Sequence, residues 1–418
     1  MIINRSFKEF KFRHRSKKNQ IIYTSKKIND DEEVINLINN FLSEKNSFIF
    51  ESVEKGKIKG RYTIFGKNPD KIWEFNNNNS YLIIDKKKVK LKEKPQKLIE
   101  DIIENFKFNV PSGLPPISSL ISGYFSYDSI RYVEKIPNTC KDDLKIPDVR
   151  LLRPRTLIIH DNLKKKIFYI INIFKDEKIN NYQKKYLEIK SDLSKLLIQA
   201  STKNFVTPSF KKSHKINVKS NTSKKKFLSI VNKAKKYIKL GDIFQVVLSQ
   251  RFQAKLSKSP LEIYKKLRTT NPSPFMFFFN FNDFQIIGAS PEILVRLRDN
   301  TITVRPIAGT RPRGKTLSQD KFYEKDLLND KKELSEHLML LDLGRNDAGK
   351  VSKINTIKVT ESFVIERYSH VMHIVSNVIG KYNKKFSKFK SLLAGFPAGT
   401  VSGAPKIRAI EIIDELET

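Results

Sequence analysis

The stretch Val304-Arg305-Pro306-Ile307-Ala308-Gly309-Thr310-Arg311-Pro312-Arg313 carries the strongest signal in this sequence. Its apolar start predicts a strand, which runs into Gly309 and Thr310 and so brings bare backbone and a hydroxyl to the edge of a pocket, beside guanidinium groups. In the helix expected to follow, Glu333 and Glu336 lie one turn apart and share a face. Two carboxylates placed in this way suit a divalent cation, and Mg²⁺ is the natural choice.

Each of these two patterns is weak when taken alone. A Gly-Thr pair after a strand is usually only a turn, and a carboxylate pair at this spacing is usually a solvated helix face. The interpretation as a ligand site therefore depends on the rest of the chain.

The composition predicts a cytoplasmic globular protein. The chain has 418 residues, of which 39% are hydrophobic and 11% aromatic, enough for a large core or two fused cores at roughly 100 to 200 residues per domain. The single cysteine, Cys140, excludes an intramolecular disulfide framework and a four-thiolate zinc site, and it fits a reducing cytosol. No apolar run approaches the roughly 18 residues of a membrane helix.

The formal charge of +36 makes a nucleic-acid binder an alternative, because such an excess normally indicates a polyphosphate partner and salt-sensitive binding. The lysines, however, are spread along the whole chain, as in residues 86–92, 164–166 and 224–226. They do not gather in one basic stripe with stacking aromatic residues. We therefore expect solvated lysine-rich faces and no nucleic-acid partner.

The chain is expected to divide near residue 205 into an N-terminal region, 1–205, and a catalytic region, 206–418. Strands predicted in the first region are Ser47–Glu51, Tyr62–Gly66, Tyr81–Asp85 and a hairpin of Thr156–His160 with Ile167–Ile173. Residues 200–223, rich in Ser, Thr and Lys, are expected to form a connector.

Capping signals define the first elements after the connector. Thr222 or Ser223 is expected to cap a helix that ends at Gly241, and Ser259 with Pro260 to start a second helix. The strands expected around and after that second helix are Ile243–Phe252, Phe275–Asn280, Gln285–Ala289, Ile293–Leu297 and Thr301–Ile307. The last four have connections too short for parallel crossovers, which predicts an antiparallel meander.

Ordered motifs from about Phe48 to the last residue resemble component I of anthranilate synthase, the chorismate-using aminating subunit. They are Glu51-Ser52, Gly60-Arg61-Tyr62, Gly123-Tyr124-Phe125-Ser126-Tyr127-Asp128, Gly241-Asp242-Ile243-Phe244-Gln245, Ser249-Gln250-Arg251-Phe252, Asn271-Pro272-Ser273-Pro274-Phe275-Met276, Ser290-Pro291-Glu292, the Pro306 to Arg313 run, Glu336-His337-Leu338-Met339, Asp342-Leu343, Arg345-Asn346-Asp347, Tyr368-Ser369-His370-Val371-Met372-His373 and Ala398-Gly399-Thr400-Val401-Ser402-Gly403-Ala404-Pro405-Lys406. Each motif is weak singly, but so many in order make coincidence negligible.

The resemblance implies an α+β fold, an α/β sandwich of antiparallel sheets flanked by helices. It also implies a Mg²⁺-dependent attack of ammonia on chorismate, followed by loss of pyruvate to leave anthranilate. A metal bound to the ring carboxylate would draw charge toward that end while the hydroxyl departs.

The resemblance also assigns roles to individual residues. It makes Glu336 a metal ligand and Glu333 a catalytic residue that supports it, and it makes Gly309, Thr310 and Thr400 substrate-binding residues. His373 matches the catalytic histidine, and its imidazole could protonate the departing hydroxyl. Without the resemblance, a satisfied histidine on an apolar strand is the better interpretation of His373.

Two positions discriminate between related chemistries. Relatives that hydroxylate chorismate carry a water-activating lysine where this chain has Gln245, so water is not the expected nucleophile. Aminodeoxychorismate synthases of the common type carry a nucleophilic lysine where this chain has Ala308, which cannot form a covalent adduct. Direct attack by ammonia is therefore expected, and aminodeoxychorismate synthase component I is the second hypothesis.

The resemblance further implies feedback inhibition by tryptophan. The matching inhibitor-binding residues are Glu51, Ser52, Pro274, Phe275 and Met276. The alternative is that both stretches are simply strand and turn.

The ammonia donor is not encoded in this chain, because Cys140 lies in no nucleophile elbow. The family borrows a glutamine amidotransferase subunit, component II, and two copies of each subunit are expected. The chain stops at Thr418, within a helix expected from Ile407, whereas the family continues to a second metal ligand. A fragment or a truncated gene with little turnover is therefore expected.

Overall fold

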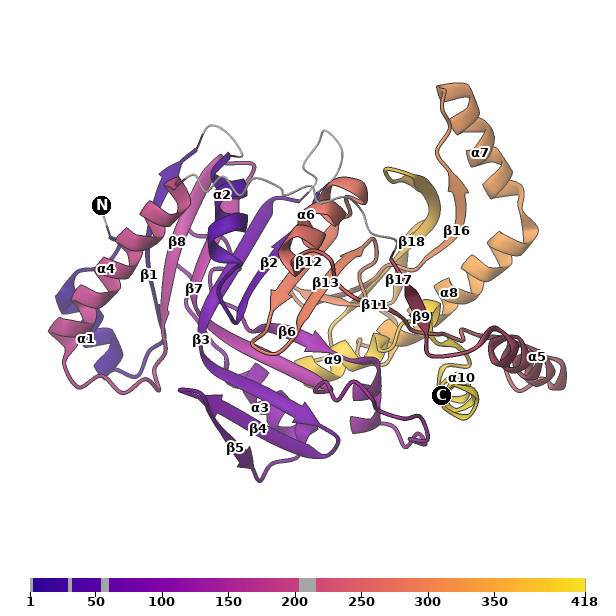
Figure 1. Ribbon diagram of the computed structural model, residues 1–418, viewed down its shortest axis with the longest axis horizontal. Coiled ribbons are helices and arrows are strands. Elements are labelled where there is room, and N and C mark those ends of the chain that lie inside the picture. Colours follow the sequence, from indigo (N-terminus) through magenta and orange to yellow (C-terminus); the bar gives the residue numbers. More distant parts are fainter. Residues whose placement is uncertain (1–2, 29–31, 54–59, 203–215, 418) are drawn as a thin grey trace.

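The computed structural model describes residues 3–28, 32–53, 60–202 and 216–417. Two antiparallel sheets with helices against them form the body of the molecule (Figure 1). The expected α+β class and the sandwich of antiparallel sheets flanked by helices are confirmed. None of the helices in the described residues is long and apolar enough to cross a membrane.

The larger sheet has ten strands and takes them from both halves of the chain. Its central path runs β1 (Gln20–Lys27), β8 (Lys166–Ile173), β7 (Val149–Asp161), β3 (Tyr62–Asn76), β2 (Ser47–Glu51), β12 (Phe275–Asn280) and β13 (Gln285–Ser290), with β4 (Asn79–Ile84), β5 (Lys87–Leu91) and β6 (Ser122–Phe125) paired beside it. Because β12 pairs with β2, strands from beyond residue 205 complete the N-terminal sheet. The division of the chain near that residue stays a prediction.

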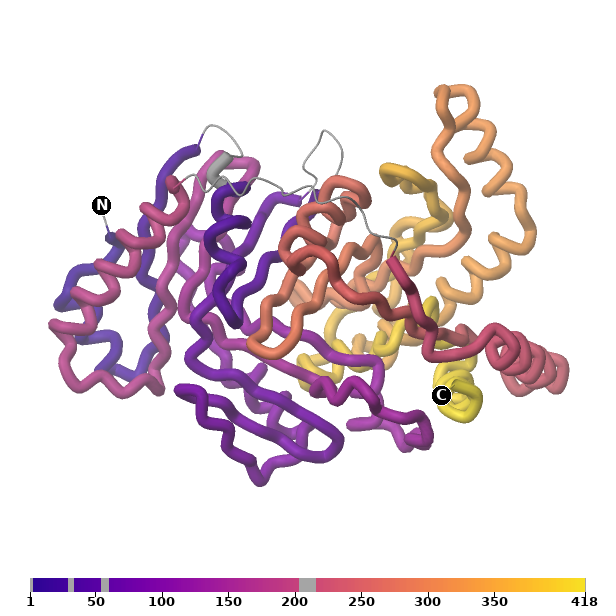
Figure 2. The backbone as a smooth tube through the Cα atoms, viewed as in Figure 1, coloured from indigo at the N-terminus to yellow at the C-terminus, as the bar shows by residue number. Residues whose placement is uncertain are grey.

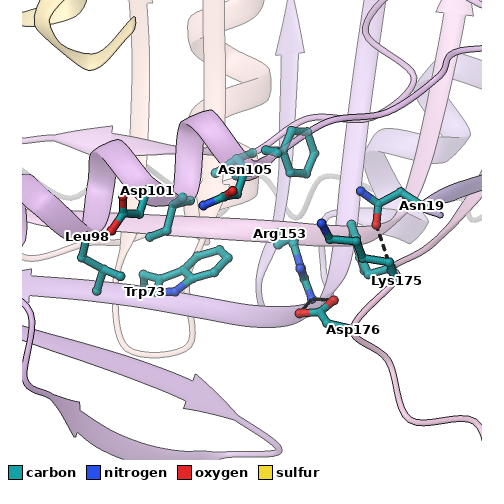
Figure 3. Close-up of a pocket in the computed structure, with 12 residues that line it drawn as sticks. Asn19, Trp73, Leu98, Asp101, Asn105, Arg153, Lys175 and Asp176 are labelled. Atoms are coloured by element: carbon teal, nitrogen blue, oxygen red, sulfur yellow. Dashed lines mark hydrogen bonds and ion pairs between the residues drawn. The ribbon is translucent and has the colours of Figure 1, made fainter. Parts of the chain in front are cut away.

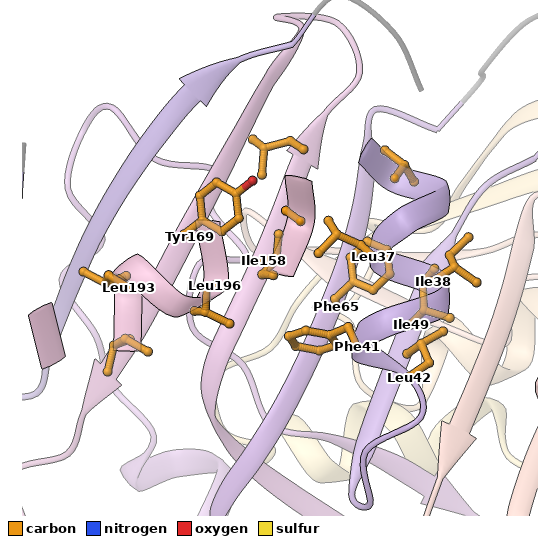
Figure 4. Packing of buried hydrophobic residues seen from close by; sticks show 14 of the residues in the cluster. Leu37, Ile38, Phe41, Leu42, Ile49, Phe65, Ile158, Tyr169, Leu193 and Leu196 are labelled. Atoms are coloured by element: carbon orange, nitrogen blue, oxygen red, sulfur yellow. The ribbon is translucent and has the colours of Figure 1, made fainter. Parts of the chain in front are cut away.

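Both faces of the larger sheet are buried, which follows from the alternation of side chains along each strand. In β7, Ile158 packs on one face, while Leu157 and Ile159 pack on the other. Four helices supply residues to the first face: α1 (Phe7–Arg15), α2 (Glu32–Phe41), α4 (Tyr182–Ser201) and α6 (Pro260–Thr270). Figure 4 shows Phe41 and Leu196 of two of these helices against the strands.

The smaller sheet contains most of the stretch 304–313. It runs β14 (Arg296–Arg298), β15 (Thr301–Val304), β18 (Val371–Lys381) and β16 (Ile307–Pro312), and β17 (Lys358–Arg367) also pairs with β18. Helices α8 (Lys331–Gly349) and α9 (Lys388–Gly395) pack against this sheet. Between β16 and α8, helix α7 (Leu317–Asn329) projects away from the body, as the backbone trace shows (Figure 2).

The remaining elements are short or lie at the edges. They are α3 (Pro95–Asn105), η1 (Tyr127–Tyr132), β9 (Val218–Ser220), α5 (Lys224–Leu240), β10 (Gln245–Val246), β11 (Phe252–Ala254), η2 (Gly399–Val401), β19 (Gly403–Ala404) and α10 (Lys406–Leu416). Strand β10 pairs with β19, and β11 pairs with β9. The pairing of β10 with β19 joins the start of the catalytic region to its end.

Several local predictions are confirmed. The strands Ser47–Glu51 and Phe275–Asn280 have the expected bounds, and the hairpin of β7 and β8 forms. Ser223 caps α5, and Gly241 ends it at φ 82°. Ser259 caps α6 in a capping box with Glu262. Of the expected connector, residues 203–215 lie outside the described residues.

Three expectations about the strands are wrong. Residues 243–252 are not one strand, because Gln245 and Val246 pair with β19 whereas Phe252 pairs with β9. The expected meander is split between the sheets, since β13 ends in the larger sheet and β14 begins the smaller one. The strand expected over 301–307 breaks at Pro306, which has no N–H to donate to a neighbouring strand.

Candidate active site

A bulge between β16 and β18 forms the centre of the site. Ala308 pairs with Ile374 and Thr310 with His373, so Gly309 has no partner in the register. Gly309 has φ +67°, and a Cβ on it would lie 3.3 Å from Glu333 Oε2. A glycine is thus required where the strand passes the first turn of α8.

His373 is oriented by this bulge. Its Nδ1 lies 3.0 Å from the carbonyl oxygen of Gly309 and 3.1 Å from Thr310 Oγ1. Because a carbonyl only accepts, Nδ1 carries the proton in the bond to Gly309, which leaves Nε2 for another partner. Gly309, Thr310, Glu333 and His373, four of the residues expected in the site, therefore lie together.

Glu333 is held at the start of α8. Asp330 caps this helix and accepts hydrogen bonds from the backbone N–H groups of Lys332 and Glu333. Arg311 donates to Asp330 at 2.8 Å, and its Nη1 lies 4.0 Å from Glu333 Oε1. The arginine that follows the Gly-Thr pair thus ties the strand to the acidic end of the helix.

Glu336 lies one turn further along α8. Its Oε1 accepts a hydrogen bond of 3.2 Å from Gln245 Nε2. Gln245 lies in β10, so the two ends of the catalytic region meet at this carboxylate. The other amide atom, Gln245 Oε1, is buried and has no hydrogen-bond partner among the described residues.

The carboxylates of Glu333 and Glu336 are the donors that a metal would use here. The described residues contain no group of three or more His, Cys, Asp or Glu side chains that could hold a metal ion. Mg²⁺ commonly binds proteins through one or two carboxylates, with substrate and water oxygens completing the shell. The donor set therefore fits Mg²⁺ held jointly with an acidic substrate. His337 is no candidate ligand, because it is fully buried and its Nε2 lies 2.7 Å from Ser376 Oγ.

The face of α8 that carries Glu336 continues into a cavity. Leu340, Leu343 and Asp347 follow at helical spacing and line this cavity together with Glu292 and Thr400. At about 1.5 Å of rise per residue, Leu343 lies roughly 10 Å along the axis from Glu336. The cavity has a volume of about 30 Å³, room for a water-sized group, so a ligand lying along α8 from the carboxylates would reach its mouth.

Thr400 contacts a residue for which the sequence suggested no role. Its Oγ1 donates to Glu292 Oε2 at 3.4 Å. Burial raises the pKa of the Glu292 carboxyl to about 7, and the hydrogen bond from Thr400 opposes this rise only in part. A carboxyl with such a pKa can exchange a proton near neutral pH. The signal in the sequence was the motif Ser290-Pro291-Glu292, but it gives no indication of burial.

The residues expected to bind tryptophan separate into two groups. Ser52, Pro274 and Phe275 line one hollow of about 300 Å³. Glu51 and Met276 are paired across β2 and β12 and are buried. The Glu51 carboxylate accepts hydrogen bonds from the hydroxyl of Tyr264 and from Arg268 Nε. These two residues support the wall of the hollow instead of lining it.

The hollow and the cavity share two chain segments. Pro291 and Ile293, on either side of Glu292, line the hollow, and Ile293 also lines the cavity. Arg305 and Ile307 line the hollow two to four residues before Gly309, while Pro306 between them lines the cavity. A ligand in the hollow would therefore touch both chain segments that lead into the site.

Comparisons with known proteins agree with this geometry. A family model described as chorismate binding enzyme matches residues 46–418. The chain is 44% identical to anthranilate synthase component 1 of Cereibacter sphaeroides, over 99% of this chain and 83% of that protein. It is 42% identical to the protein of the same name from Acetivibrio thermocellus, over 93% of this chain and 80% of the relative.

Solved structures show the same likeness. The crystal structure of anthranilate synthase component I from Streptococcus pneumoniae TIGR4 superposes with a TM-score of 0.76 at 34% identity, covering 88% of this chain and 79% of that one. The isochorismate synthase MenF of Escherichia coli gives a TM-score of 0.64 at 15% identity, covering 98% of this chain and 83% of its own. At that identity the second likeness concerns the fold alone.

Proposed function

Because this chain belongs to the anthranilate synthase component 1 family of chorismate binding enzymes, we propose that it converts chorismate and ammonia to anthranilate and pyruvate in the cytoplasm. This is the first committed step of tryptophan biosynthesis. The resemblance identified from the sequence motifs is confirmed. The observation that carries the proposal is the convergence of Gly309, Thr310, His373 and Glu333 at one bulge, next to Glu336.

Glu336, with Glu333 beside it, would hold a Mg²⁺ ion together with the ring carboxylate of chorismate. When bound, the ion supplies Lewis-acid chemistry: it draws negative charge toward the carboxylate end of the ring as the hydroxyl departs. Gln245 Nε2 fixes the direction of the Glu336 carboxylate. Asp330 and Arg311 fix the start of the helix that carries both ligands.

His373 is the first proton donor in this proposal. Its Nδ1 is turned to the Gly309 carbonyl, so a protonated ring presents Nε2–H to the substrate. Protonation of the departing hydroxyl by Nε2 follows from this orientation.

Glu292 is the second proton-exchanging group. With a pKa of about 7 it is partly protonated at neutral pH. It faces the cavity that continues from Glu336 along α8, and Thr400 holds one of its oxygens. We assign to Glu292 the proton exchange that accompanies the loss of pyruvate, through this small cavity.

Ammonia is the nucleophile that the site favours. The unpaired Gln245 Oε1 offers a hydrogen-bond acceptor to an incoming N–H, beside the ligand Glu336. Ala308 precludes the lysine adduct of the common aminodeoxychorismate synthases. Ammonia would come from the glutamine amidotransferase subunit, component II, in a heterotetramer with two copies of each subunit. Aminodeoxychorismate synthase component I is not favoured by the relatives found.

Tryptophan inhibition is proposed at the hollow lined by Ser52, Pro274 and Phe275. An indole bound there would contact Pro291 and Ile293, and so bear directly on the segment that carries Glu292. Replacing Ser52 with Leu should raise the tryptophan concentration for half inhibition by at least about ten-fold, because the added side chain fills the hollow. Inhibition at an unchanged concentration would contradict the assignment.

The function is tested by incubating the chain with chorismate, Mg²⁺ and ammonium while anthranilate fluorescence is recorded and the products are identified by mass. His373→Asn should lower the rate by at least about a hundred-fold. His370→Asn is the matched control, because the His370 imidazole bonds only to the Thr270 carbonyl oxygen among the described residues. A para-substituted product, or neither anthranilate nor Mg²⁺-dependent chorismate binding, would contradict the proposal.

A further inference from the structure

A second hollow lies in the N-terminal region, away from the helix α8 that carries the metal ligands. It opens between α3 and the segment that follows β8, as Figure 3 shows, and has a volume of about 270 Å³. Its walls are largely apolar, formed by Trp73, Leu98, Ile102, Ile121 and Phe174. Trp73 and Phe174 are buried, so the indole and phenyl rings are fixed parts of the wall.

The acidic groups around the hollow are already paired. Asp176 forms ion pairs with Lys71 at 2.5 Å and with Arg153 at 3.1 Å. Burial alone would raise the pKa of Asp176, but these two cations lower it to about 2. Asp101 pairs with Lys97 at 3.0 Å. These carboxylates are therefore poor sites for a cationic ligand.

The basic groups are less fully engaged. Arg153 lies over the ring of Phe174 at 3.9 Å, and its Nε and Nη2 are bound by Asp70 and Asp176. Its Nη1 makes no hydrogen bond within the part of the chain that the structure describes. Lys175, on the exposed rim, forms no ion pair with any described residue. The uncompensated charge at the hollow is thus positive.

We propose that this hollow binds a small monocarboxylic acid with an apolar body. The body would pack against Trp73, Leu98 and Ile102, and the carboxylate would be bound by Lys175 and by Nη1 of Arg153. An apolar floor with a few polar groups at the rim is the usual form of a small-molecule site. Because Asp70 and Asp176 hold Nε and Nη2 of Arg153, the guanidinium is fixed in place and offers Nη1 as one charge-assisted donor.

Trp73 provides a direct probe, because it is the only tryptophan in the chain. Its fluorescence, excited selectively, is recorded while the intact chain is titrated with 3-phenylpropionate. The matched probes are 3-phenylpropanamide, which is neutral, and 3-phenylpropan-1-amine, which is cationic. We expect a saturable change with the carboxylate and an affinity about five-fold above that of the amide, as one partly exposed ion pair would give. The amine should bind most weakly.

Charge reversal at the rim separates specific binding from a general effect of charge. Lys175→Glu should abolish the preference for the carboxylate over the amide and favour the amine. Lys178→Glu is the control, because Lys178 is exposed, does not line the hollow and carries the same charge. Both lysines are on the surface, so both variants are expected to fold, which melting curves would verify.

Three results would overturn the proposal. They are no saturable change of Trp73 fluorescence, equal affinities for the carboxylate, the amide and the amine, and identical behaviour of the Lys175→Glu and Lys178→Glu chains. These outcomes are independent of chorismate turnover, so they do not depend on the proposed function.

Discussion

Gly309→Ala is the change that tests the bulge most sharply. The new Cβ would lie 3.1 Å from the terminal methyl carbons of Ile374 and Leu327 and 3.3 Å from Glu333 Oε2. The left-handed backbone at φ +67° costs an L-residue about 1–2 kcal/mol. The free energy of unfolding should therefore fall by about that amount, with a further penalty where the three neighbours must shift.

The substitution should also weaken metal binding, by a free energy similar to the loss of stability. The Glu333 carboxylate has to move by a few tenths of an ångström, and changes in groups that position metal ligands typically lower affinity by about ten- to a hundred-fold. Urea unfolding measures the first effect, and calorimetric titration of Mg²⁺ in the presence of chorismate measures the second.

Gly349→Ala is the matched control for this substitution. Gly349 ends the same helix, and a Cβ on it would have nothing within 4 Å. If the Gly309→Ala chain has the same Mg²⁺ affinity and the same unfolding free energy as the control, then the bulge does not require a glycine at residue 309.

Three further predictions concern the buried charges and the arginine of the site. The carboxyl of Glu292 has a pKa of about 7 in the folded protein, above its ordinary 4.5. The free energy of unfolding should therefore fall by about 3 kcal/mol as the pH rises from 4.5 to 7. Urea unfolding at several pH values measures this decrease, and Glu292→Gln should remove it. In the structure the buried Lys406 ammonium lies 2.8 Å from the Asp347 carboxylate. Asp347→Ala should destabilise the fold by about 3–5 kcal/mol in the same assay, because it leaves this ammonium without its ion-pair partner. Arg311→Gln should weaken Mg²⁺ binding in calorimetry, since it removes the ion pair to Asp330. Arg345→Gln, on the exposed face of α8, should leave Mg²⁺ binding unchanged. Equal effects of the two substitutions would contradict the role of Arg311.

The parts of the site that could be predicted from the sequence are close together along the chain or joined by strand pairing. Glu333 and Glu336 share a helix face because their spacing requires it, and Gly309 brings bare backbone beside Glu333, as its lack of a side chain indicates. The link between His373 and the Gly-Thr pair needed the resemblance, since 64 residues separate His373 from Gly309.

The contacts that could not be predicted depend on tertiary neighbours. Thr400 was expected at the substrate, and it donates to Glu292, whose raised pKa comes from burial and not from any local motif. Gln245 was expected within a long strand, but its pairing with the distant Ala404 ends that strand after two residues and brings its amide to Glu336. The alternation of hydrophobic residues along the sequence does not specify which distant strand or side chain becomes the neighbour.

In the proposed mechanism, a cation held by acidic residues of α8 fixes the ring acid beside the imidazole of His373. A crystal structure of the chain soaked with chorismate and Mg²⁺ tests this most directly. We expect the ring carboxylate of chorismate and the metal at Glu336, with the ring next to His373 Nε2 and Gly309. Density for the ring acid elsewhere, away from both Glu336 and His373, would contradict it.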